Sequence, residues 1–459
     1  MPNSGTNQGG GLAVRGTDWL ISGSLLLLVL LAHAASPVTT STDSAWTFHV
    51  SASILQEGDL DLDEYLPLMD LDRDYRLREV DGSVYYYYPA ATPLLVAPVL
   101  ALADSILSVF QGADLLSYLA SHGPNARTAQ FEKLVASAIV AISAVLMYLV
   151  ARASSGRGVS IMVALIFAFA TSMWSTASRA LWQHGPSVLC LTLALLLTVR
   201  SKDRASSIFF TGMLLCFAYL VRPTNALSLG FLGLYFLRRD RGNIWSFALG
   251  VLVVLVPYLV QNVITYSNVL PPYSYQLFER LGTPKTILEA MLGTLFSPNR
   301  GVFVFSPVFF FAAYGAGLAF KRSAPASRNL DLILLAILVS HWLTTSLFED
   351  WGGAWSIGPR YFVDVIPYLA YFLVPFLNSG ALKVPAWRIT FALAVAVSAL
   401  VQYRGAVSPY PFMWNGKPRA LVEAPERKWD WSDLQFLRGL CPDDPLEGRA
   451  PACWIEDHG

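Results

Sequence analysis

Long apolar runs separated by short polar gaps dominate the chain between Trp19 and Tyr403. Most of these runs have about 17 to 25 residues, the length that a helix needs to cross the hydrocarbon of a bilayer. A helix satisfies its own backbone hydrogen bonds, which lipid cannot do for it. The pattern therefore predicts an all-α polytopic membrane protein.

The composition agrees with this prediction. Hydrophobic residues make up 54% of the 459 residues and charged residues only 14%, whereas a soluble globular chain has about 25% charged residues. The mean hydropathy is +0.47, the net charge is zero and the isoelectric point is about 7.0. A neutral chain lacks the basic surface that nucleic-acid binding requires, so we expect no nucleic-acid partner.

Most of the basic residues lie in short gaps between the apolar runs. By the positive-inside rule these gaps are cytoplasmic, and two spans must separate each gap from the next. The basic residues of these gaps are, in chain order, Arg15; Arg152 and Arg157; Arg200, Lys202 and Arg204; Arg238, Arg239 and Arg241; Lys321, Arg322 and Arg328; and Lys383 and Arg388.

Three apolar runs, 19–35, 89–110 and 133–151, lie between the first two basic gaps, where an even number is required. The run 89–110 is the exception that we expect not to cross. Its prolines Pro89, Pro93 and Pro98 disfavour a continuous helix, and Asp104 is costly in hydrocarbon. We expect it to be a helix that lies along the outer membrane face or dips into it. About 11 spans result.

These spans divide the chain into three parts. Residues 1–18 form a cytoplasmic N-terminus, residues 19–403 form the transmembrane domain, and residues 404–459 form an extracytoplasmic tail. The transmembrane domain includes a large first outer loop, residues 37–132. The first run ends in Ala32-His33-Ala34, which is similar to a signal-peptidase site, so its cleavage is left open.

The four cysteines are of two kinds. Cys190 and Cys216 lie inside apolar runs and are expected to be buried packing residues. Cys441 and Cys453 lie in the tail and would form a disulfide if the tail faces an oxidising compartment. The chain has no CxxC or Cys/His spacing that is typical of a metal site.

Asp43 is the first candidate for chemistry, because it follows the first span and precedes a stretch with helical spacing. An aspartate in that place is also an ordinary helix N-cap. The acidic run 57–64 is typical of a solvated surface. Tyr85 to Tyr88 would anchor the chain at the membrane face or form a wall against a sugar ring.

Several cations lie at outer turns, where the positive-inside rule disfavours them: Arg179, His184, Arg222, Arg300 and Arg360. An arginine side chain binds a phosphate through two parallel hydrogen bonds. The alternatives are contact with lipid headgroups and, for Arg360, a helical ion pair with Asp364 four residues later. Repetition at separate turns favours a phosphate site.

The order of these segments resembles the bacterial membrane glycosyltransferases of the GT-C superfamily, and within it the protein O-mannosyltransferase-like branch (glycosyltransferase family 39-like). The resemblance covers most of the chain. After Asp43 it rests on SILQEGDLDLDEY, YYYYPAATPLL, LWQHGP, RPTN, LFSPNRGVFVFSP, WGGAWSIGPRY and PERKWDWSDLQ.

The resemblance implies that Asp43 is the catalytic base and that the large first outer loop, with its membrane-surface helices, builds the active site. The donor would be a sugar on a polyprenyl phosphate. Two departures concern the substrates: Ser44 stands where many relatives have a second acid, and tyrosines stand where aminoarabinose transferases have a lysine before the prolines.

The sequence therefore predicts an inverting transfer of a hexose or pentose to an acceptor hydroxyl on a glycan, lipid or protein, at the outer face of a bacterial cytoplasmic membrane. No metal or other cofactor is implied. A transporter or flippase of lipid-linked sugars, or a non-catalytic envelope assembly protein, are the alternatives. The candidate residues are Asp43 as the base; Arg360, Arg300, Arg222 and His184 for the donor phosphate; and Tyr87, Tyr88, Glu349, Asp350, Trp351 and Tyr361 for substrate.

A base and a phosphate clamp that serve one sugar must face a common cavity. We therefore expect Asp43, Arg300 and Arg360 to line one cleft under the first outer loop, roughly 6–12 Å apart if the reacting groups are in near-attack geometry.

Overall fold

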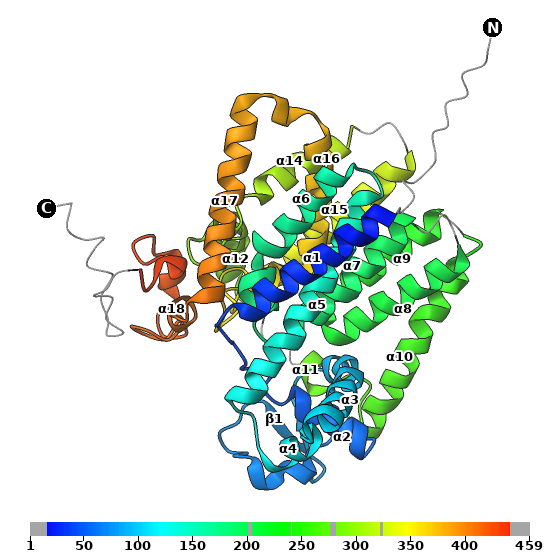
Figure 1. Ribbon diagram of the computed structural model, residues 1–459, viewed down its shortest axis with the longest axis vertical. Coiled ribbons are helices and arrows are strands. Elements are labelled where there is room, and N and C mark those ends of the chain that lie inside the picture. Colours follow the sequence, from blue (N-terminus) through cyan, green and yellow to red (C-terminus); the bar gives the residue numbers. More distant parts are fainter. Residues whose placement is uncertain (1–15, 201–203, 240, 276–280, 322–324, 441–459) are drawn as a thin grey trace, which may run out of the picture.

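The computed structural model describes residues 16–200, 204–239, 241–275, 281–321 and 325–440. Within them the chain is a bundle of long helices with a smaller outer-loop layer at one end (Figure 1). The predicted Cys441–Cys453 disulfide lies outside the described residues, and Cys190 and Cys216 are buried free cysteines. The main bundle helices are α1 (Gly16–Ala35), α5 (Ala126–Arg152), α6 (Arg157–Phe169), α7 (His184–Arg200), α8 (Ala205–Val221), α9 (Ala226–Arg239), α10 (Ile244–Tyr266), α12 (Pro284–Phe296), α14 (Phe309–Ala319), α15 (Pro325–Ser346), α16 (Ile366–Asn378) and α17 (Pro385–Val407).

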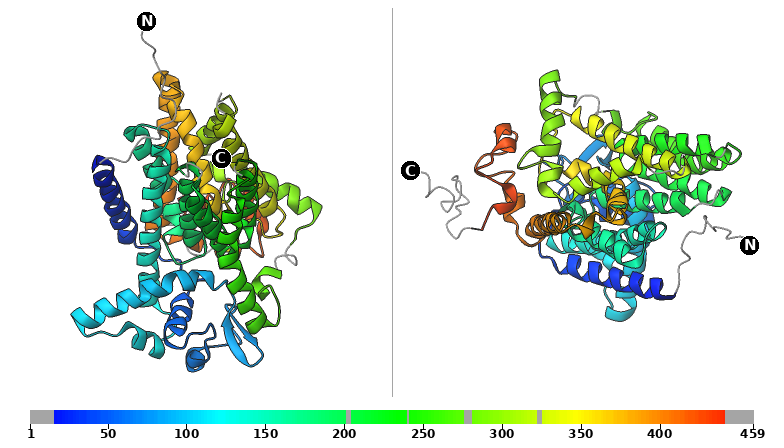
Figure 2. Two further views of the ribbon diagram at one scale, coloured as in Figure 1. Left: turned by 90° about the vertical axis from the view of Figure 1, so that its right-hand side faces the viewer. Right: turned by 90° about the horizontal axis from the view of Figure 1, so that it is seen from above.

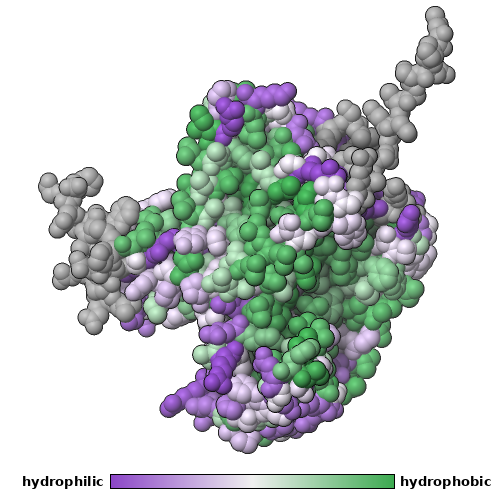
Figure 3. Space-filling view, viewed as in Figure 1, coloured by the Kyte–Doolittle hydropathy of each residue, from purple (hydrophilic) through white to green (hydrophobic). Residues whose placement is uncertain are grey.

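The chain is a multi-pass membrane protein. Among the described residues, seven helices are long and apolar enough to cross a membrane, and four shorter apolar helices of 10–17 residues accompany them. Apolar side chains form a broad area over the middle of the bundle, while polar ones gather on the outer loop and at the opposite tip (Figure 3). The count of 11 spans stays a prediction.

Close helix crossings use glycine. A Cβ at Gly250 of α10 would collide with the carbonyl oxygen of Phe209 in α8, and a Cβ at Gly212 of α8 with that of Phe247 in α10. Small residues let backbones approach in this way where lipid supplies little force to drive helices together.

The outer-loop layer contains α2 (Thr47–Gln56), α3 (Ala91–Gln111), α4 (Leu115–Ser121) and a hairpin of β1 (Leu77–Val80) and β2 (Ser83–Tyr86). The prediction of an all-α chain missed this hairpin. Asp81 and Gly82 both have positive φ, as the Asp-Gly turn of a two-residue hairpin requires. Alternation along β2 buries Val84 and Tyr86 on one face.

Helix α3 is the run that was expected to lie along the membrane face. It packs on α2 and α4 and runs crosswise to α5 below the bundle (Figure 2, left). The predicted helix is confirmed, and the prolines do not interrupt it: α3 is continuous from Ala91 to Gln111 with Pro98 inside. Pro93 stands in the first turn, where a backbone N–H is not needed.

Three of the predicted cytoplasmic gaps meet at one end of the bundle. Asp18 near the start of α1 pairs with Arg152 and Arg157. Asn378 at the end of α16 donates to the Ser155 hydroxyl at 2.7 Å. The outer-turn residues discussed next lie at the other end.

Candidate active site

A cavity of about 1010 Å³ lies between the outer-loop layer and the end of the bundle. Six segments far apart in sequence supply most of its wall, at 42–47, 86–92, 181–184, 222–224, 348–361 and 421–428. The first two belong to the outer loop and the last to the C-terminal tail. The cavity is therefore built by tertiary folding rather than by any one motif.

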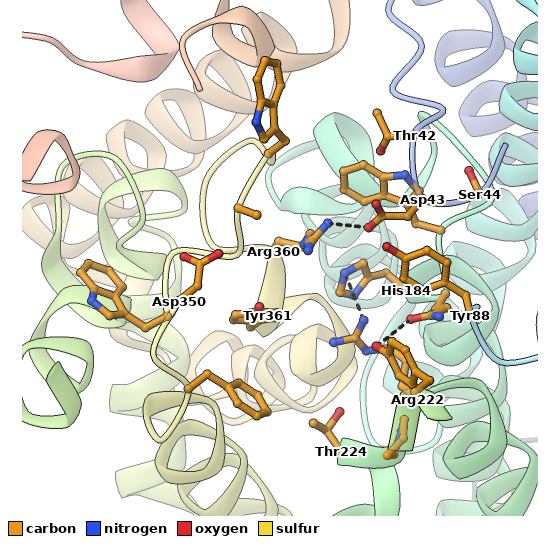
Figure 4. Close-up of a pocket in the computed structure, with 18 of the residues that line it drawn as sticks. Thr42, Asp43, Ser44, Tyr88, His184, Arg222, Thr224, Asp350, Arg360 and Tyr361 are labelled. Atoms are coloured by element: carbon orange, nitrogen blue, oxygen red, sulfur yellow. Dashed lines mark hydrogen bonds and ion pairs between the residues drawn. The ribbon is translucent and has the colours of Figure 1, made fainter. Parts of the chain in front are cut away.

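Asp43 and Arg360 face each other in the wall of this cavity (Figure 4). Arg360 Nη1 lies 3.2 Å from Asp43 Oδ2, which is closer than the separation of roughly 6–12 Å expected for a base and a phosphate clamp. The Tyr75 hydroxyl donates to Asp43 Oδ1 at 2.9 Å, and the Tyr86 hydroxyl donates to the Asp43 carbonyl. Asp43 keeps 26% of its side chain exposed and Arg360 keeps 15%, so the pair is open to a ligand.

Asp43 is not a helix cap. Helix α2 begins at Thr47, and its N-cap position is Trp46, which makes no side-chain capping bond. The Asp43 carboxylate is directed instead to Arg360 and Tyr75. The capping alternative is thereby removed.

Arg222 and His184 form a second polar group, around Asp364. Arg222 Nε lies 2.7 Å from Asp364 Oδ2, and His184 Nδ1 lies 3.5 Å from the same oxygen. Arg222 and His184 line the cavity, whereas Asp364 is fully buried behind them. The alternative of an Arg360–Asp364 pair is wrong, because Arg360 pairs with Asp43 and Asp364 pairs with Arg222.

Arg300 does not line the cavity, contrary to the expectation of a common cleft. Its side chain is 1% exposed. Nη1 donates to the Asn299 carbonyl at 2.7 Å and to Gln435 Oε1 at 2.9 Å, and Nη2 donates to Asn415 Oδ1 at 2.5 Å and to the Ala354 carbonyl at 3.2 Å. With both terminal nitrogens engaged and the side chain buried, Arg300 holds the tail to the bundle and does not reach the cavity.

The tyrosine run divides by strand alternation. Tyr86 and Tyr88 line the cavity, whereas Tyr87 points to the Arg78 guanidinium, 4.8 Å from its ring centre, and is not part of the wall. Burial, followed by the nearby Asp43 charge, raises the pKa of Tyr88 and of Tyr75. Both phenols therefore stay protonated and can donate.

The opposite wall is acidic and aromatic. Glu349, Asp350, Trp351 and Tyr361 all line it, as the sequence predicted. Lys428 of the tail places Nζ 4.4 Å from the centre of the Trp351 ring, and burial lowers the pKa of this lysine. Within the part of the chain that the structure describes, no cluster of three or more His, Cys, Asp or Glu side chains could hold a metal ion.

Sequence reasoning missed three contributors. Trp182 lies under the Arg360 guanidinium at 5.0 Å, Lys428 comes from the tail, and Glu132 binds the loop that carries Asp43. Glu132 had one signal: it is an acid just before an apolar run. Nothing local distinguishes the other two from interfacial and surface residues.

Comparison with known proteins gives structural similarity alone. No protein-family model matches the chain, and neither does any curated protein. The apo oligosaccharyltransferase of Archaeoglobus fulgidus superimposes with a TM-score of 0.50 at 13% identity, over 95% of this chain and 60% of the archaeal one. ArnT from Cupriavidus metallidurans bound to undecaprenyl phosphate gives 0.48 at 15% identity, over 86% and 72%. The chain spans about three-fifths of the oligosaccharyltransferase, and it has the GT-C fold that the sequence pattern indicated. The O-mannosyltransferase-like branch stays a prediction.

Proposed function

We propose that this protein transfers a hexose or pentose from a polyprenyl-phosphate donor to an acceptor hydroxyl on a glycan, lipid or protein, with inversion at the anomeric carbon. The site would face the outer side of a bacterial cytoplasmic membrane, because only that arrangement leaves the basic gaps in the cytoplasm. The single observation that carries the proposal is the Asp43–Arg360 pair, open to the cavity. The GT-C fold supports it.

The reaction is a single displacement. The acceptor oxygen attacks the anomeric carbon and its proton passes to an Asp43 carboxylate oxygen. The bond between the anomeric carbon and the phosphate oxygen breaks at the same time, and the electron pair leaves with the polyprenyl phosphate. A phosphate leaves without being protonated, so one carboxylate suffices where glycosidases need two.

Arg360 would have two successive partners. Without donor, its Nη1 is bound to Asp43. A donor phosphate carries a compact negative charge that a guanidinium binds well, so it would compete with Asp43 for this nitrogen. Donor binding would then release Asp43 to act as the base, and the donor would bind before the acceptor reacts.

Arg222 and His184 are placed to contribute less to phosphate binding. Asp364 already neutralises Arg222 from behind, at 2.7 Å. Their proposed part is to fix the far edge of the cavity and to offer donors to the departing phosphate. Tyr88, Glu349, Asp350, Trp351 and Tyr361 would contact the sugar or the acceptor.

The test uses protein reconstituted in liposomes with a panel of undecaprenyl-phosphate-linked neutral and amino sugars, and it measures the release of undecaprenyl phosphate. We expect turnover with at least one donor, its survival in EDTA, and its loss in Asp43→Asn. Asp70→Asn is the matched control, since Asp70 lies in the same loop, is 61% exposed and pairs only with surface Arg73 among its described contacts.

A second measurement follows from the two partners of Arg360. Asp43→Asn removes the carboxylate that competes with the phosphate for Arg360. The affinity of this variant for undecaprenyl phosphate should therefore rise, by about fivefold at most for an exposed pair. Unchanged release of lipid phosphate in Asp43→Asn, or translocation of an intact lipid-linked sugar without release, contradicts the proposed transfer.

A further inference from the structure

Glu132, in the second turn of α5, is fully buried and lies next to the cavity wall. It accepts hydrogen bonds from Ser44 Oγ at 2.6 Å and Ser41 Oγ at 2.8 Å, one on each carboxylate oxygen. The Leu181 amide donates at 3.4 Å to the oxygen that also accepts from Ser44. Among the described residues, no Lys, Arg or His forms an ion pair with it.

These contacts join two segments that meet at the candidate site. Ser41 and Ser44 stand on either side of Asp43. Leu181 precedes Trp182, whose ring lies under the Arg360 guanidinium. One carboxylate therefore connects the segment that carries the base to the segment that supports its arginine.

Such a group is costly for the fold. A carboxyl group buried without a cation loses its hydration, and hydrogen bonds from neutral hydroxyls and an amide repay only part of that cost. A serine-lined loop could pack on an apolar residue at lower cost. The hydrogen bonds to Ser41, Ser44 and Leu181 explain an acid at this position, because they hold the two segments together.

We infer that Glu132 is a positioning residue for the proposed transfer: it fixes the 41–44 loop so that the Asp43 carboxylate meets the acceptor hydroxyl. This inference rests on the proposed function. Ser44 directly follows Asp43, and its hydroxyl donates to this carboxylate, which belongs to another helix. Misplacing a base by about 1 Å can cost about 10²-fold in rate.

The experiment compares Glu132→Gln with Ser137→Ala in the full-length protein. The amide of glutamine keeps the size of the side chain but has one acceptor oxygen, so one of the two serines loses its acceptor and must turn its hydroxyl to accept from the amide N–H instead. Ser137 lies on the same helix, is equally buried, and donates to the Lys133 carbonyl at 2.7 Å. Its loss controls for a change in α5 packing.

For Glu132→Gln we expect kcat to fall about 10²-fold, while KM for the donor and the Kd for undecaprenyl phosphate stay within twofold of the parent. Backbone hydrogen exchange should rise at 41–47 and 181–184 and nowhere else. Ser44→Ala should reproduce the loss of kcat, and Ser137→Ala should show none of it.

A parallel loss of kcat, undecaprenyl-phosphate binding and melting temperature would show a merely structural acid and overturn the inference. Unchanged exchange at 41–47 in Glu132→Gln would overturn it as well. The exchange experiment needs no substrate. If the parent protein turns over no donor, the proposed function fails, while exchange still decides whether Glu132 holds the two segments.

Discussion

A buried aspartate near the start of helix α1 and a half-buried one after its end differ in how completely their carboxylates are bound. Asp18, near its start, is 1% exposed and accepts from the Tyr148 hydroxyl at 2.6 Å, from Arg152 Nε at 3.0 Å and from Arg157 Nε at 3.2 Å. Asp43, beyond its end, is bound by Arg360 and by tyrosine hydroxyls, and it opens onto the cavity. The same pair of residue types serves as an internal tie in one place and as a candidate reacting group in the other.

What separates them is access rather than charge. Removing one partner of an ion pair that is closed off from water strongly destabilises the fold. A partly exposed pair contributes little to stability. An open, weakly held pair can exchange partners with a ligand. This comparison predicts opposite results for the same substitution at the two ends.

The largest expected effect comes from Asp43→Asn set against Asp18→Asn. Asp43→Asn should lower transfer by about 10²- to 10⁴-fold and change the free energy of unfolding by less than about 0.5 kcal/mol. Asp18→Asn should cost about 3–5 kcal/mol of stability, because Arg152 and Arg157 lose their partner, while the folded fraction keeps its turnover. Turnover per folded molecule measures the change in transfer, and denaturant unfolding in detergent measures the change in stability. Equal stability losses at the two sites would break the comparison.

The next effect concerns the arginine partners. Arg360→Ala should weaken undecaprenyl-phosphate binding by about tenfold to a hundredfold, the value of a charge-assisted hydrogen bond of about 1.5–3 kcal/mol. Arg152→Ala should leave this affinity unchanged and lower the melting temperature. Native mass spectrometry with added undecaprenyl phosphate measures the affinity. A loss of lipid-phosphate binding in Arg152→Ala but not in Arg360→Ala would place the phosphate site at the Asp18 end and contradict the prediction.

The smallest effect is a pH dependence confined to the outer loop. Burial lowers the pKa of His49 in α2 to about 4, from the usual histidine value of 6.5. The folded protein therefore holds His49 in its neutral form. The stability that this gives is present above pH 6.5 and is lost as the pH falls toward 4. The loss at pH 6 is roughly 0.8 kcal/mol. His49→Gln should flatten this dependence, measured by hydrogen exchange of α2, while the Asp18 end stays unchanged.

The spans could be predicted because hydrophobicity acts over one helix at a time. Each apolar run shows its length and its flanking charges in the sequence, and the run 89–110 was correctly predicted to be helical. Its position along the membrane face stays a prediction from parity, because α3 is also long and apolar enough to span a bilayer. The hairpin was missed although Asp81-Gly82 is its local signal. The strands there have only four residues each, too few for a clear alternation.

The site could be predicted residue by residue but not as an arrangement. Asp43 and Arg360 are 317 positions apart, and no local pattern states that they touch. The misplaced Arg300 shows the physical limit: an arginine at an outer turn is a phosphate ligand or an internal clasp according to which acceptors reach it. Here the acceptors are Asn415 and Gln435, which sequence alone does not bring near.

The Arg300 clasp also bears on how the protein is made. Residues 421–428 of the tail complete the cavity wall, and Asn415 and Gln435 tie that tail to Arg300. Synthesis runs from the N-terminus, so Asp43 and Arg360 are made before this part of the wall exists. A nascent chain arrested before the tail would contain both residues yet lack a closed cavity. The proposed transfer could then begin only after translation of the tail ends.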